Sequence, residues 1–195
     1  MIRRASLRMP LVALGLGLCV GALTSVLQAH LDFPWLALVN AVSPWLTTAF
    51  VAGALQERLR TALWVGAVAT AMQVVGYYAT AELRGYDASM TYVVLWSVCA
   101  VVGGPVFGAA GFSWRRAAPA GLGAAALVAA YASEALVSYE LRLGYTSSAV
   151  LFLVVAVGLA VGLGRHRGQL GAMLRWLVPA LLAGAAGHLV LALVV

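Results

Sequence analysis

Long apolar runs separated by short polar turns make up most of this chain. In the stretch from Thr61 to Arg116, two such runs flank the polar turn 82–86, and the second run closes at Trp114-Arg115-Arg116. A similar turn, 140–145, precedes a later run that closes at Arg165-His166-Arg167. An apolar run of about 20 residues can cross the hydrocarbon of a bilayer as a helix. Each pair of runs therefore predicts a helical hairpin in a membrane.

Seven runs of this kind predict an all-α, polytopic membrane helix bundle that forms one domain over residues 1–195. Helices are expected because lipid offers no partner for backbone polar groups. The first six runs would form three parallel helical hairpins, followed by a final helix. We expect Pro44 to bend the second helix, because proline removes a backbone donor. The expected bounds are 9–28, 34–55, 61–81, 91–112, 118–139, 147–164 and 176–195.

Composition agrees with a lipid environment. The chain is 64% hydrophobic and 9% charged, whereas soluble domains carry about 25% charged residues. All of its 12 basic residues are arginine, which excludes lysine chemistry such as a phosphate-loop lysine or a Schiff base. Cys19 and Cys99 both lie inside apolar runs, where buried apolar residues are favoured over a metal or redox pair.

The arginines predict the orientation. With the N-terminus in the cytoplasm, the inner loops hold ten of them and the outer loops hold Arg84 and Arg142. This bias follows the positive-inside rule. It predicts a multi-pass protein of the cell inner (plasma) membrane, with the C-terminus outside and no nucleic-acid partner. The ten inner arginines are Arg3, Arg4, Arg8, Arg58, Arg60, Arg115, Arg116, Arg165, Arg167 and Arg175.

Small residues recur at every fourth position in several runs. Examples are Gly17 and Gly21, Gly104 and Gly108, and Gly158 and Gly162. Such ladders let membrane helices approach closely. We favour packing within the chain, and the alternative is a seam that binds a partner membrane protein.

Glu134 lies inside the fifth run, about five residues from its outer end. Carboxylates inside a membrane are costly and usually face a cavity or a partner. Tyr131 and Ser138, three and four residues away from Glu134, are expected to share its helical face. Two interpretations stay open: an acid that binds a ligand or a proton, and a structural carboxyl that pairs with Arg142 or a neighbouring tyrosine.

Other polar residues lie in the outer halves of the predicted helices, and they predict an outward-facing pocket with an aromatic rim. Acidic and aromatic lining favours a small cationic or aromatic ligand. The alternative is an interfacial belt of Tyr and Trp with no ligand, in which His188 is a packed histidine. The candidate ligand-binding residues are Glu134, Gln73, Tyr77, Asn40, His188, Tyr131 and Gln28; the expected rim is Trp35, Tyr78, Tyr86, Tyr92, Trp96, Tyr139 and Tyr145.

Motifs of enzymes are missing from the sequence: it has no His-Glu-x-x-His, no Gly-x-Ser-x-Gly and no phosphate loop. His30-Leu31-Asp32 is too short to argue for a metal site. We therefore expect no enzyme activity, no cofactor and no metal.

Two groups of motifs lie between Asn40 and Arg116. One is Ser43-Pro44-Trp45-Leu46 with the run 49–55; the other is Gly76-Tyr77-Tyr78, Leu95-Trp96 and the run 102–108, Val-Gly-Gly-Pro-Val-Phe-Gly. Together they resemble a family of small actinobacterial integral membrane proteins of unknown function. The resemblance implies no activity and supplies no catalytic or binding residues.

Two functions follow as hypotheses. The first is a permease-like subunit that binds or transports a small molecule, with Pro44 and Gly103-Gly104-Pro105 as deformable points. The second is a non-transporting accessory or structural protein, whose small-residue seams bind another membrane protein.

Overall fold

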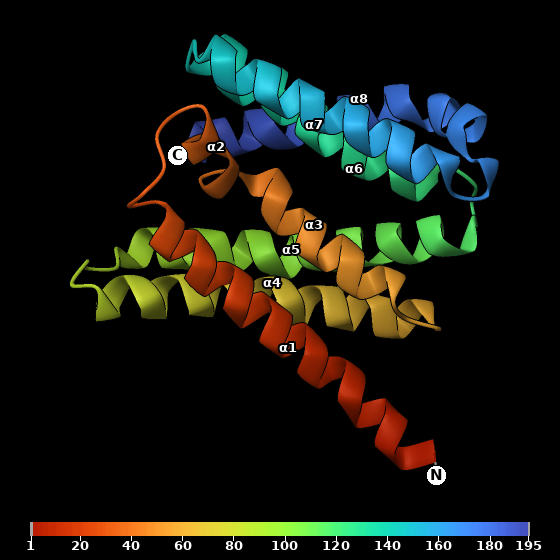
Figure 1. The fold of residues 1–195 in the computed structure, drawn as a ribbon, viewed down its shortest axis with the longest axis horizontal. Coiled ribbons are helices and arrows are strands. Elements are labelled where there is room, and N and C mark those ends of the chain that lie inside the picture. The colour runs from red at the N-terminus through yellow and green to blue at the C-terminus, as the bar shows by residue number, and fades with distance from the viewer. Residues whose placement is uncertain (1, 195) are drawn as a thin grey trace. The chain divides into compact units, whose positions relative to one another are not determined.

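Helices form almost all of the protein. The structure, a computed structural model, describes residues 2–194, with side chains described from residue 11. No strand occurs in this part of the chain, so the predicted all-α class is confirmed. The helices (Figure 1) are α1 (Ile2–Leu27), α2 (Trp35–Val39), α3 (Val42–Ala54), α4 (Leu59–Leu83), α5 (Met90–Arg116), α6 (Leu122–Ser133), the π-helix η1 (Glu134–Arg142), α7 (Thr146–Arg165), the short 3₁₀-helix η2 (His166–Gly168) and α8 (Leu170–Val194).

Five helical stretches of the described chain are long and apolar enough to cross a membrane: Leu59–Leu83, Met90–Arg116, Leu122–Arg142, Thr146–Gly168 and Leu170–Val194. Large apolar side chains are exposed along them, such as Val101 at 62% and Leu182 at 68%. Exposed apolar surface of this extent is rare on soluble proteins and is normal where lipid is the solvent. These helices indicate membrane insertion. Seven spans and their hairpin arrangement stay predictions. The structure does not describe Val195 or the side chains of Arg3, Arg4 and Arg8.

The predicted second helix, 34–55, is wrong as one continuous element. It is two helices, α2 and α3, separated at Asn40 and Ala41. Pro44 does not bend a helix interior, because it is the third residue of α3. In the first turn of a helix the missing proline donor costs nothing, since that N–H has no partner within the helix.

Two predicted helix starts and one predicted deformable point also differ. The fifth run was expected from residue 118, but α6 starts at Leu122 after Gly121, whose φ of +80° breaks the helical path. The seventh was expected from 176, but α8 begins at Leu170. Helix α5 runs unbroken through Pro105, so the expected deformable point at 103–105 lies inside a continuous helix.

The chain forms two compact units. Unit 1 comprises Met1–Leu31 and Pro44–Phe112. In it α1 packs along α4 (Figure 1). A Cβ on Gly21 would lie 2.1 Å from the carbonyl oxygen of Gln73, and one on Gly53 would lie 2.0 Å from that of Gly108. The prediction that Gly17, Gly21, Gly104 and Gly108 pack within the chain is confirmed, because a Cβ at each would meet α4 within 2.8 Å.

Unit 2 comprises Asp32–Ser43 and Ser113–Val195. Helix α6 packs against both α7 and α8 (Figure 1). Phe152 of α7 is fully buried, with its ring 5.7 Å from that of Tyr131 and 4.9 Å from that of Tyr139. Gly158 and Gly162 of α7 differ from the other ladders, because a Cβ on either would meet no described atom within 4 Å. Packing within the chain is therefore wrong for this one ladder.

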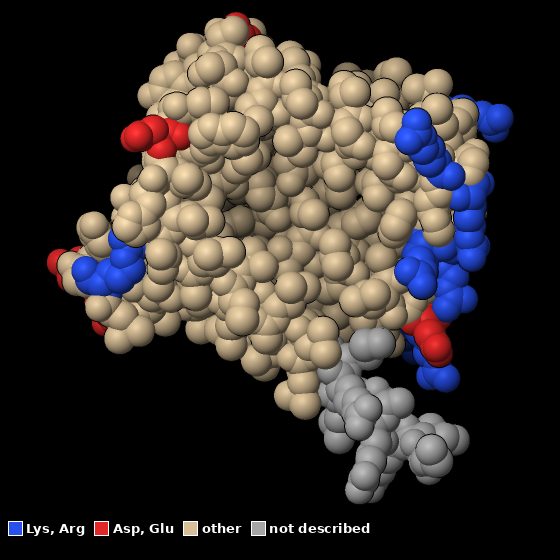
Figure 2. Space-filling model, viewed as in Figure 1, with Lys and Arg blue, Asp and Glu red and all other residues tan. Residues whose placement is uncertain are grey.

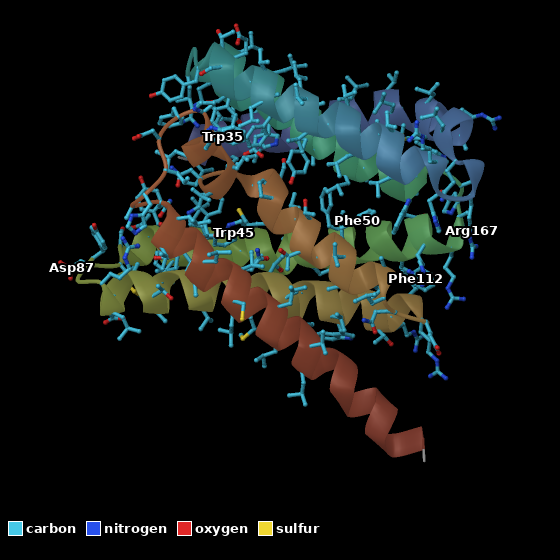
Figure 3. All side chains as sticks on the ribbon, in the orientation of Figure 1. Trp35, Trp45, Phe50, Asp87, Phe112 and Arg167 are labelled. Carbon is cyan, nitrogen blue, oxygen red and sulfur yellow. The ribbon has the colours of Figure 1, made fainter. Side chains whose placement is uncertain are left out.

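Charged side chains gather at the ends of the helices within each unit (Figure 2). In unit 1, Arg58 and Arg60 lie at the start of α4, and Asp87 lies in the loop at its other end (Figure 3). In unit 2, Trp35 of α2 and Arg167 lie at opposite ends (Figure 3). The helix middles thus carry few charges, as expected for segments that cross hydrocarbon.

Candidate functional site

The carboxylate of Glu134 binds the start of α3. Its two oxygens accept hydrogen bonds from the backbone N–H groups of Val42 and Ser43, each over 2.8 Å. Glu134 is 4% exposed, so this contact is buried. The residues lie more than 90 positions apart in the sequence but belong to the same unit.

This contact satisfies backbone N–H groups that the break between α2 and α3 leaves at the start of α3. The first N–H groups of a helix have no partner within it, and an unpaired donor is costly in an apolar surrounding. A carboxylate satisfies two of them and interacts favourably with the positive end of the helix dipole. Of the two interpretations of Glu134, the geometry therefore matches a structural carboxyl. Its partners are backbone amides, which the sequence interpretation did not consider.

A second side chain holds the other side of the same break. The hydroxyl of Tyr139 donates a hydrogen bond of 3.0 Å to the carbonyl oxygen of Ala37 in α2. Tyr139 is 5% exposed, so its expected place on a pocket rim is wrong. Glu134 and Tyr139 together bind the end of α2 and the beginning of α3; we call these two residues the break clamp.

The π-helical form of η1 explains how both residues reach the break. In an α-helix, residues five apart point about 140° away from each other around the axis. A π-helix has a wider turn that is bonded from residue i to i+5, so such residues come onto one side. Glu134 and Tyr139 are five apart and both lie in η1. The local change from α- to π-helix therefore positions the clamp.

Three of the predicted site residues lie in unit 1. Gln73 of α4 is fully buried, and its Nε2 donates to the hydroxyl of Thr48 over 3.1 Å, while its Oε1 has no hydrogen-bond partner. One turn further along α4, the hydroxyl of Tyr77 donates to Oε1 of Gln28 over 2.6 Å. The Tyr77 ring also makes an edge contact with Trp45, at 5.9 Å between centroids. These pairs connect α1, α3 and α4.

The other four predicted residues, Glu134, His188, Tyr131 and Asn40, lie in unit 2. His188 is 8% exposed and its Nδ1 lies 3.3 Å from the hydroxyl of Ser138. Tyr131 is buried against Phe152, and Asn40 ends α2 as an exposed residue. Ser138, expected on the face of Glu134, contacts α8 instead, because the π-helix alters the spacing.

Sequence reasoning missed Thr48 and the backbone amides of Val42 and Ser43. It placed Tyr139 on a pocket rim and missed its contact with α2. Backbone amides are present at every residue and carry no sequence signal. The five-residue spacing of Glu134 and Tyr139 could be noticed only if a π-helix were expected, and nothing in the run 118–139 indicates one.

The single pocket stays a prediction. An open hollow of about 410 Å³ lies near the C-terminal end of α4, lined by Ala79, Glu82 and Leu83; none of the candidate residues is among these three. Among the described residues, no group of three His, Cys, Asp or Glu side chains is placed to hold a metal ion.

Comparison with known proteins identifies a family for the chain. A model of a family of unknown function, DUF6518, matches residues 2–193, so the chain belongs to that family. No curated protein and no solved structure matched the chain.

Proposed function

We propose that this member of DUF6518 is a permease-like subunit of the cell inner (plasma) membrane that binds a small molecule from outside. The moving part would be the break between α2 and α3, held by the break clamp. The N-terminus would lie in the cytoplasm and the C-terminus outside, following the arginine bias of the sequence.

The clamp is the observation that carries this proposal. Irregular backbone at membrane depth is tolerated only where it is buried in protein or lines a water-filled cavity. Helices broken in this way supply the binding sites of many secondary transporters, where free helix ends point at the substrate or ion. Here the N–H groups of Val42 and Ser43, at the start of α3, donate to Glu134, a carboxylate of the chain itself.

Two separate features, one in each unit, favour a cationic or aromatic ligand. Each carboxylate oxygen of Glu134 accepts one backbone hydrogen bond and keeps capacity for a second. A ligand cation could add to that carboxylate without displacing the amides. In unit 1, the rings of Trp45, Tyr77 and Tyr78 form edge contacts at 5.9 and 5.0 Å, and such rings favour cations and flat molecules.

A thermal-shift screen of the detergent-solubilised protein tests this proposal. Cationic and aromatic metabolites would be added to wild type, Glu134→Gln and Glu140→Gln. Glu140 is the matched control, because it lies in the same π-helix but is exposed and binds only Thr146, over 3.3 Å. A hit should stabilise wild type and the control and lose its effect on Glu134→Gln. A hit that stabilises all three equally would remove Glu134 from the site.

The second candidate function is an accessory protein that binds another membrane protein through α7. Gly158 and Gly162 support it, because their open surface would let a partner helix approach closely. Replacing both glycines by isoleucine should then abolish crosslinking to a partner in cells while leaving the melting temperature unchanged. Unchanged crosslinking would exclude this seam.

A further inference from the structure

We propose that one end of unit 2 binds the phosphate of an anionic phospholipid. We call this surface the arginine end, and it is independent of the proposed ligand site at the clamp. Its arginines come from the end of α5, the end of α7 with η2, and the second turn of α8, and all are exposed. They are Arg115, Arg116, Arg165, Arg167 and Arg175.

Charge at the arginine end is of one sign. Of the described residues in unit 2, the acidic ones are Asp32, Glu134 and Glu140. Asp32 precedes α2, and Glu134 and Glu140 both lie in η1. None of these three acidic residues belongs to the helix ends that carry the five arginines. Arginine matches the geometry of phosphate oxygens because its planar fork can bind two of them at once.

The backbone beneath these arginines is held in one arrangement by Gln169. This side chain is 2% exposed. Its Oε1 accepts from the N–H of Gly121 over 2.9 Å, and its Nε2 donates to the carbonyl oxygens of Trp114 and His166 over 3.0 and 3.1 Å. The helix ends that carry the arginines are thus linked to one another, which lowers the entropy lost when they bind one anion together.

A second link runs between α5 and α7. The indole N–H of Trp114 donates to the carbonyl oxygen of Leu163 over 3.0 Å, and its ring lies 4.7 Å from that of His166. Arg167 donates to the carbonyl oxygen of Arg116 over 3.4 Å. Arg115 and Arg116 are therefore close to Arg165 and Arg167 in the fold. Each of these two pairs also closes an apolar run in the sequence.

The neighbouring surface of α8 favours a lipid over a soluble anion. Leu170, Leu174 and Val178 are spaced four apart and are 47%, 59% and 64% exposed. Residues four apart share one helix face, so an apolar strip leads away from Arg175 along α8. Trp176 is also 38% exposed, as is common at the membrane interface. If the phosphate of a phospholipid binds among the arginines, the acyl chains of that lipid can run along this strip.

Native mass spectrometry of the detergent-solubilised full chain tests the lipid proposal. The probes are phosphatidylglycerol, phosphatidylcholine and inorganic phosphate. We expect phosphatidylglycerol to bind at least fivefold more tightly than phosphatidylcholine, and phosphate alone not to be retained. Because the side chains of Arg165 and Arg175 are exposed, the variant Arg165→Gln/Arg175→Gln should remain folded and lose at least fivefold in phosphatidylglycerol affinity.

The matched control is Arg58→Gln/Arg60→Gln, which removes two exposed arginines from the start of α4 in unit 1. It should keep wild-type affinity for phosphatidylglycerol. Equal losses in the two double variants would mean a diffuse effect of charge and would overturn the proposal. Retention of inorganic phosphate as strong as that of the lipid would also overturn it, because the site would then be one for a free anion. The melting temperature of each variant without lipid shows that it is folded.

Discussion

At the scale of single residues, Glu134 shows what the sequence can and cannot predict. Its position inside an apolar run predicts a buried carboxylate with a partner, and the structure gives it a buried place. The partners could not be predicted, because backbone amides look the same at every position. Its predicted neighbour on the helix face, Ser138, contacts His188 instead. An acidic residue in an apolar membrane run thus predicts a buried carboxylate with a partner, but it does not predict which group that partner is.

Gln169 allows a prediction at the same scale. Gln169→Leu would remove three hydrogen bonds of a buried side chain and leave the N–H of Gly121 without its acceptor. Because an unsatisfied buried group costs about 1–3 kcal/mol, we expect a loss of roughly 2–4 kcal/mol of unfolding free energy. Denaturant unfolding in detergent would measure it. Gln56→Leu is the control, since buried Gln56 donates only to Ala52 within its own helical segment, and its loss should be about 1 kcal/mol or less. Equal losses of unfolding free energy in the two variants would mean that the hydrogen bonds of Gln169 do not hold the helix ends together.

At the scale of helices, regular elements were predictable and irregular ones were not. The runs that became α4, α5 and α7 were found to within four residues at each end, because apolar length alone defines them. The break at Asn40 and Ala41 and the π-helix η1 were not found. Each is stabilised by the other through Glu134 and Tyr139. Such mutual stabilisation over about 90 residues has no periodic signal in either segment.

Two glycines of α1 give a prediction about helix packing. A Cβ on Gly21 would lie 2.1 Å from the carbonyl oxygen of Gln73, whereas one on Gly15 meets no described atom within 4 Å. Gly21→Ala must push α1 away from α4, at a cost of about 1–3 kcal/mol. Gly15→Ala should be neutral or stabilising by up to about 1 kcal/mol, because alanine favours helix. Melting temperatures of the two variants would decide this, and a Gly21→Ala variant as stable as Gly15→Ala would contradict close α1–α4 packing.

At the scale of the whole molecule, the distribution of charged residues indicates which parts of the chain lie in the membrane. Apolar helices and the separation of arginines within each unit agree with a chain embedded in a bilayer (Figure 2). The sequence predicted this environment because few charges and long apolar runs have no other stable solution. The single pocket that it predicted stays a prediction. In unit 1, Tyr77 binds Gln28 and Gln73 binds Thr48; in unit 2, Glu134 binds backbone amides of α3 and His188 contacts Ser138.

Orientation is testable with single cysteines. In a variant with Cys19 and Cys99 replaced by alanine, Asp87→Cys would place a thiol in the exposed α4–α5 loop, and Arg58→Cys one at the start of α4. We expect a membrane-impermeant maleimide to label intact cells at position 87 immediately and at position 58 only after permeabilisation. This follows from the positive-inside rule. The reverse pattern would place the N-terminus outside.

Hydrogen–deuterium exchange at the start of α3 tests the break clamp most directly. The peptide that contains Val42 and Ser43 would be followed in wild type, Glu134→Gln and Glu140→Gln. A glutamine can accept through only one atom, so at least one of these amides loses its acceptor. We expect that peptide to exchange about tenfold faster in Glu134→Gln than in the other two proteins. Identical exchange in all three would contradict the claim that the Glu134 carboxylate holds the broken helix.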